Sequence, residues 1–180
     1  MKHFETQNSL WEQCVRFHGH ECGGLALGFQ AARYAAELLE IDFSDDEQVV
    51  CVAENDACGI DAIQVLLGCS VGKGNLLFHL TGKQAFTFFC RSSNRSVRLV
   101  AKEKPSHLKR GESMQYYLST AFDLLFDQKP AAVKLPEPAK IFRSVLCEKC
   151  GERTAENYVR LQNGKLLCCD CADQYSRFDI

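Results

Sequence analysis

Two Cys-x-x-Cys pairs near the C-terminus carry the strongest chemical signal in the sequence. They are Cys147 with Cys150 and Cys168 with Cys171, and 17 residues separate the two pairs. Each pair lets one turn present two sulfurs on the same side, and two such turns complete a four-thiolate tetrahedron of the kind that holds structural zinc. We therefore predict a structural zinc ion here, with two disulfides or redox-active dithiols as the alternatives. The adjacent Cys169 is expected to be packed or exposed, not a fifth ligand.

A second group of possible ligands lies far upstream. His18, His20 and Cys22 alternate along the glycine-rich stretch 18–24, and Cys58 precedes a predicted helix. In an extended conformation the three alternating side chains project to one side. Imidazole and thiolate donors suit zinc or another borderline-soft metal. We predict that these four residues hold a second transition metal, with Cys22 near a helix N-terminus that favours its thiolate.

Catalytic and structural uses of this second group both remain open. In a catalytic use, Cys22 or Cys58 is a metal ligand or nucleophile and Lys73 holds an anionic substrate group. In a structural use, the histidines are capping or core residues and the cysteines are small buried hydrophobes. The loop 68–74 is similar to a phosphate-binding loop but lacks one residue and the Ser/Thr that would hold magnesium, so no nucleotide site is expected. A solvated turn lysine is the alternative for Lys73.

Composition bounds the class of protein. The chain has 180 residues, 46% of them hydrophobic, which is enough to fold a sizeable core. The net charge of −2 predicts no general attraction to nucleic acid or to acidic membranes. The eleven cysteines, the polar opening residues and the lack of an 18-residue apolar run favour a reducing cytoplasmic location without a membrane span. Residues 91–110 are basic and residues 37–61 are acidic, which indicates solvated faces or patches that dock two protomers together.

Hydrophobic periodicity predicts an α+β fold, because runs of helix and runs of strand are partly segregated. We expect a core domain of helices packed on a mostly antiparallel sheet over 1–126, a proline-containing linker over 127–140, and a small zinc-pinned domain over 141–180. The expected helices cover about 5–17, 25–39, 59–67 and 112–126, and the expected strands cover about 49–53, 75–80, 84–90 and 96–101.

The C-terminal region has the element order of a treble-clef zinc finger. A cysteine knuckle comes first, and Asn163-Gly164 then predicts a hairpin between two short strands. The second cysteine pair leads into 172–178, which we expect to be helical. The finger carries five basic and six acidic residues over 147–180, so nucleic acid is not an expected partner.

Two long motifs, FHGHECGGLALGFQAA and ENDACGIDAIQVLLGCSVGKGNL, together with the terminal cysteine pairs, resemble the FmdE-like family, which takes its name from formylmethanofuran dehydrogenase. The resemblance implies an α+β core with an appended treble-clef finger, a homodimer, and a metal-associated site. It places His18, His20 and Cys22 beside Cys58, with Asp61, Cys69 and Lys73 lining the site. Family members often have Pro after the cysteine of HGHxC, where this chain has Gly23, which loosens the first helical turn.

These observations predict an FmdE-like zinc- or transition-metal-binding protein that acts in or alongside one-carbon or molybdenum-enzyme metabolism of the formylmethanofuran dehydrogenase type. The alternative is a non-enzymatic metal-handling protein or adaptor that grips a protein partner through its finger. Whether the chain catalyses a reaction, and on which small-molecule substrate, stays open from the sequence.

Overall fold

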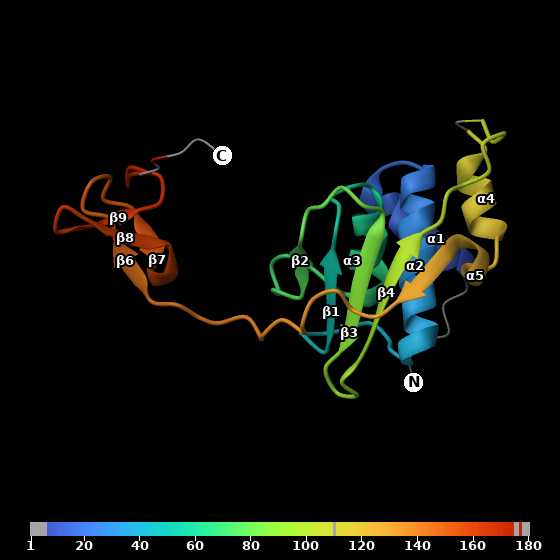
Figure 1. Ribbon diagram of the computed structural model, residues 1–180, viewed down its shortest axis with the longest axis horizontal. Helices are drawn as coiled ribbons and strands as arrows, with labels where there is room; N and C mark the ends of the chain where they lie inside the picture. The colour runs from blue at the N-terminus through green and yellow to red at the C-terminus, as the bar shows by residue number, and fades with distance from the viewer. Residues whose placement is uncertain (1–6, 110, 175–176, 178–180) are drawn as a thin grey trace. The chain divides into compact units, whose positions relative to one another are not determined.

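The computed structural model of the protein describes residues 7–109, 111–174 and 177 (Figure 1). The chain divides into two compact units, Met1–Ala139 and Lys140–Ile180. The first unit carries the α+β core, and the second carries the four cysteines of the C-terminal pairs.

A five-stranded sheet forms the core, in the order β2-β1-β3-β4-β5. Only β1 and β2 run parallel, and the other neighbours are antiparallel, so the α+β prediction is confirmed. The central strands are the most buried, as expected for runs rich in Val and Phe. The strands are β1 (Val49–Ala53), β2 (Leu76–Phe78), β3 (Ala85–Cys90), β4 (Arg95–Ala101) and β5 (Phe126–Lys129).

Helices cover one face of this sheet, as Figure 1 shows, and α2 lies against α1, α3 and α4. Leu25, Ala26 and Phe29 of α2 are fully buried, because almost every face of this helix packs against a neighbour. The helices are α1 (Gln7–His18), α2 (Gly23–Leu39), α3 (Gly59–Leu67), α4 (Ser113–Ser119) and α5 (Phe122–Leu125).

The single helix expected over 112–126 is wrong. Thr120 and Ala121 have extended backbone dihedrals, so α4 ends before them and the short α5 follows. The chain then continues as β5, which pairs with β4 along Phe126–Lys129. The last three residues of β5 are exposed and polar, so the strand depends on its partner and not on a hydrophobic pattern.

The segment after β5 packs on the core over much of the interval that the sequence predicts to be a linker. Ala131, Val133 and Leu135 cover Val50 and Phe89 on the sheet face away from the helices. Farther along, the Glu47 carboxylate accepts a hydrogen bond from the backbone N–H of Ala139 at 3.0 Å. Contacts to the first unit therefore extend as far as Ala139.

The second unit consists of two small hairpins. The first joins β6 (Ser144–Leu146) to β7 (Arg153–Ala155), and the second joins β8 (Val159–Gln162) to β9 (Lys165–Cys168) after a short 3₁₀ turn, η1 (Glu156–Tyr158). Asn163 and Gly164 both have positive φ, 50° and 77°, as a two-residue hairpin turn requires, so that prediction is confirmed. Residues 172–174 are not helical, and 175, 176 and 178 lie outside the described residues.

The acidic and basic stretches largely neutralise each other within the first unit. Arg91 pairs with Glu47, Arg95 with Glu40, and Arg98 with Glu54. These contacts bind the start and body of β4 to the segments that flank and follow β1. No helix within the described residues has both the length and the apolar character needed to cross a bilayer.

Candidate metal centres

The C-terminal cysteines form one cluster. The sulfurs of Cys147, Cys150, Cys168 and Cys171 all lie within 4.8 Å of one another, as a four-thiolate zinc site requires. The Cys168 backbone N–H donates to the Cys147 sulfur at 3.3 Å. Backbone N–H groups of Cys150, Cys168 and Lys149 lower the pKa of the Cys147 thiol to about 6, which favours the thiolate that binds metal.

Cys169 does not join this cluster. Its thiol is exposed and donates to the Tyr158 carbonyl oxygen at 3.2 Å. All eleven cysteines are free of disulfides, so the four clustered sulfurs are available to a metal.

The core centre is built where two helices begin. Cys22 is the N-cap of α2, and its sulfur accepts a hydrogen bond from the Leu25 backbone N–H at 3.3 Å. Cys58 is the N-cap of α3. Gly24 leaves room for the two sulfurs, because a Cβ there would lie 3.1 Å from the Cys58 Cβ and 3.9 Å from the Cys22 sulfur. Both thiols thus face the positive end of a helix dipole, as predicted for Cys22.

His18 completes a group of three donors. Ligand atoms of His18, Cys22 and Cys58 all lie within 4.8 Å of one another. His18 Nε2 lies 3.8 Å from the Cys22 sulfur, close to the roughly 3.5–3.8 Å between donors around a tetrahedral zinc ion. Burial, together with the hydrogen bond and negative charge of Cys22, raises the pKa of the Cys58 thiol. A bound cation would displace that proton.

Asp61 fixes the orientation of the His18 ring. Its Oδ2 lies 2.7 Å from His18 Nδ1, and its Oδ1 accepts a hydrogen bond from Gln64 at 3.2 Å. A carboxylate on Nδ1 holds the proton there and leaves Nε2 free as a metal ligand. The resemblance placed Asp61 only in the lining of the site, and its contact with His18 emerges from the tertiary structure.

His20 is not part of the donor group within the described residues. The alternating extended arrangement is wrong, because α1 continues through His18 and Gly19 then reverses the chain at φ +92°. His18 and Cys22 meet across this turn, whereas the exposed His20 ring packs against the His18 ring with centroids 4.5 Å apart.

Lys73 also lies outside the centre. Its ammonium donates to the Ser44 carbonyl oxygen at 2.7 Å and lies over the Phe43 ring. The neighbouring Asn75 is fully buried and donates to the carbonyl oxygens of Val49 and Gly68, so these two side chains fasten the loop 68–74 to the core. An anion-holding role for Lys73 beside Cys58 finds no support in this geometry.

Cys69 is a core residue and not a ligand. It is fully buried, its thiol donates to the Val49 carbonyl oxygen, and burial raises its pKa to about 12. The hydrophobic interpretation of part of the cysteine set therefore applies to this residue.

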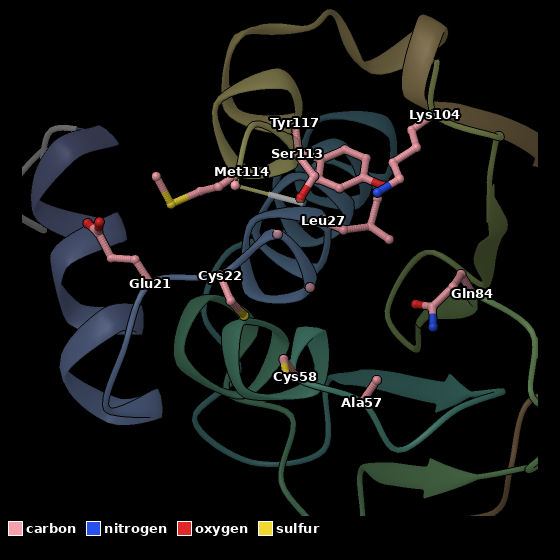
Figure 2. Close-up of a pocket in the computed structure, with 13 residues that line it drawn as sticks. Glu21, Cys22, Leu27, Ala57, Cys58, Gln84, Lys104, Ser113, Met114 and Tyr117 are labelled. Carbon is pink, nitrogen blue, oxygen red and sulfur yellow. The ribbon is translucent and has the colours of Figure 1, made fainter. Parts of the chain in front are cut away.

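The three donors lie between two cavities. One, of about 430 Å³, is bordered by His18, Asp61 and Phe78. The other, of about 560 Å³, has Cys22 and Cys58 in its wall and extends to Lys104 and Tyr117 (Figure 2). Sequence reasoning gave no role to Lys104 or Tyr117, because neither belongs to a local motif.

A four-cysteine finger and a His/Cys centre at two helix N-termini, on an α+β core, define a metal-binding protein of two units. Residues 17–135 match the family model described as FmdE, molybdenum formylmethanofuran dehydrogenase operon, and the chain belongs to this FmdE family. Residues 140–177 match the prokaryotic dksA/traR C4-type zinc finger. The resemblance drawn from the two long motifs is thereby confirmed.

Two individual proteins extend the comparison. The crystal structure of an FmdE-like protein of tungsten formylmethanofuran dehydrogenase type from Syntrophus aciditrophicus has the same fold, with a TM-score of 0.68 and 20% identity over 93% of this chain and 92% of that one. A probable S-adenosyl-L-methionine-binding protein from Archaeoglobus fulgidus is 27% identical over 88% of this chain. The chain spans about half the length of that relative, 51%.

Proposed function

We propose that the core is a metal-binding module whose working centre consists of His18, Cys22 and Cys58, and that this module acts in or alongside formylmethanofuran dehydrogenase-type one-carbon or molybdenum-enzyme metabolism. Zinc suits the mixed nitrogen and sulfur donors. The observation that carries the proposal is the convergence of three ligand atoms within 4.8 Å, one of them oriented by a carboxylate. The family assignment supports the metabolic setting.

Three protein ligands leave a fourth position for water or a substrate atom. A zinc ion with such a position polarises a carbonyl or lowers the pKa of bound water. In this chain, His18 and the two thiolates would hold the ion, Asp61 would keep Nε2 directed at it, and the cavity beside Cys22 and Cys58 would admit the small molecule. The finger would hold the second, structural zinc ion.

Metal stoichiometry tests the core centre. The purified protein should contain two tightly held metal ions per chain, measured by inductively coupled plasma mass spectrometry under reducing conditions. Cys22→Ser and Cys58→Ser should each keep only the finger ion, and Cys171→Ser should keep the core ion. One ion per chain that is lost only in Cys171→Ser would refute the core centre.

A metal-handling or adaptor protein is the second candidate. The finger exposes Leu146, Tyr158 and Leu161 by 55, 59 and 74%, which favours a protein partner over nucleic acid. In this role the core ion must leave on demand. Transfer of one ion per chain to the chelator 4-(2-pyridylazo)resorcinol within minutes would favour metal handling, and retention of both ions would favour a working centre. The homodimer is proposed from family resemblance, and its test is the mass in solution.

A further inference from the structure

The larger cavity beside the core centre has an uneven distribution of charge. Among the described residues that line it, Lys104 is the one cation and Glu21 is the one carboxylate. Figure 2 shows the Lys104 side chain directed inward from the segment after β4 and the Glu21 carboxylate directed away from Cys22 on the other side. A ligand in this cavity therefore meets positive charge from a single direction.

Between the sulfurs and Lys104 the cavity wall is largely apolar. Leu27 comes from α2, and Met114 and Tyr117 come from α4, so two helices contribute to one wall. Figure 2 shows the Tyr117 ring and the Leu27 side chain between Cys22 and Lys104. A volume of about 560 Å³ with an apolar wall and few polar groups is the usual form of a small-molecule site.

The position of this wall is set by the chain and not by solvent-exposed loops alone. Gly23 opens α2 directly against Ser113 at the start of α4, because a Cβ on Gly23 would lie 2.5 Å from the Ser113 hydroxyl oxygen. On the far side of α4, the Gln30 amide donates to the Tyr117 carbonyl oxygen at 2.8 Å. These contacts hold Met114 and Tyr117 at a fixed distance from Cys22, and a bulkier residue at position 23 would shift them.

We propose that this cavity binds a small organic carboxylate, with a soft or carbonyl donor at one end taking the open position of the core metal and the carboxylate pairing with the Lys104 ammonium. The apolar wall takes the carbon chain between the two groups. A lysine ammonium is a point charge that accepts a carboxylate without a fixed geometry, which suits a ligand held mainly at the metal. The proposal rests on the proposed metal centre.

ω-Mercaptocarboxylates of increasing length test this arrangement, because the thiol marks the metal and the carboxylate marks the cation. The core centre of the full chain is loaded with Co²⁺, and the finger keeps zinc. Mercaptoacetate, 3-mercaptopropionate and 6-mercaptohexanoate are titrated beside their uncharged amides under anaerobic conditions. The growth of the thiolate-to-cobalt charge-transfer band gives each dissociation constant.

We expect one chain length to bind about three- to tenfold more tightly as the acid than as the amide, the range of a partly solvated charge-assisted contact. Lys104→Met should remove this preference and leave the affinity for the amide unchanged. Glu21→Gln is the matched control and should keep the preference. Equal binding of acid and amide at every length, or a preference that survives Lys104→Met, would overturn the proposal.

The same titration separates this inference from the metal centre. If no Co²⁺ enters the core, the metal centre itself fails and no thiol can change the spectrum. If Co²⁺ enters, and Cys58→Ser abolishes its bands, but no probe shifts them, then the centre stands and the carboxylate site is refuted.

Discussion

Gly28 of α2 and Gly59 of α3 are in backbone contact: a Cβ on Gly28 would lie 2.1 Å from the Gly59 carbonyl oxygen. The two helices cross here without side chains between them, about one turn from the N-caps that carry the sulfurs. The close approach of Cys22 to Cys58 is therefore a result of this crossing.

Gly28→Ala should damage both stability and metal binding. The added methyl group meets backbone atoms, so the helices must separate, at about 1–3 kcal/mol of unfolding free energy. Urea denaturation measures that loss, and metal analysis should show the core ion gone and the finger ion present. Gly72→Ala is the control, since a Cβ there meets nothing within 4 Å. Full core metal in Gly28→Ala would show that the crossing does not set the ligand distance.

Asp61→Asn should weaken the core centre without unfolding it. Loss of the charged partner on His18 Nδ1 removes the bias toward the Nε2 ligand form, and such changes lower metal affinity by about 10–100-fold. Competition with a zinc chelator gives the affinity. Asp56→Asn is the matched control, an exposed carboxylate in the turn before α3. Similar losses in both variants would mean that general negative charge, and not the His18 contact, matters.

Cys171→Ser should unfold the C-terminal unit alone. Its hairpins bury few large side chains, so the metal supplies most of the folding free energy. Two-dimensional NMR should show collapsed amide dispersion for 140–180 and unchanged signals for β1 and β3. Cys169→Ser, with its thiol outside the cluster, should leave every signal dispersed. A dispersed finger spectrum in Cys171→Ser would contradict a structural zinc ion.

Glu54→Gln should destabilise the core in a pH-dependent way. The Arg98 guanidinium donates to both carboxylate oxygens, at 2.5 and 2.9 Å, and holds the pKa of Glu54 below its usual value. The stabilisation is therefore complete above the unfolded pKa of about 4.3 and is lost as the pH falls through the lower folded pKa. Leaving Arg98 buried and unpaired costs about 3–5 kcal/mol at neutral pH.

Urea titrations at several pH values check this prediction. The difference between wild type and Glu54→Gln should shrink steadily below about pH 4, where the unfolded carboxyl begins to hold its proton. Glu40→Gln, which breaks an exposed pair with Arg95, should change stability by less than about 1 kcal/mol at any pH. A constant difference across the pH range would show that the carboxylate charge is not what stabilises the sheet.

Sequence patterns predicted the elements that bury continuous apolar runs. The helix α3 and the strand β1 occupy the expected residues, because each has a pattern that a local window captures. By contrast, β5 was missed since Asp127, Gln128 and Lys129 have no strand pattern and form a strand only by pairing with β4. Long-range partners decide such segments.

The candidate site was predictable in its chemistry and less so in its membership. Residue types and spacing identified the four finger cysteines and the pairing of Cys22 with Cys58. They could not show that a left-handed Gly19 turns His20 aside, or that Lys73 reaches a carbonyl 29 residues earlier. Those outcomes depend on a single backbone dihedral and on loop packing.

The sulfur of Cys22 caps α2 through the Leu25 N–H, an interaction that needs no ion. The helix can therefore begin at the same residue whether the core is loaded or empty. An empty core would stay assembled and wait for its cargo, whereas an empty finger loses what organises it. The chain thus combines an exchangeable metal in a preformed socket with a permanent one that serves as architecture.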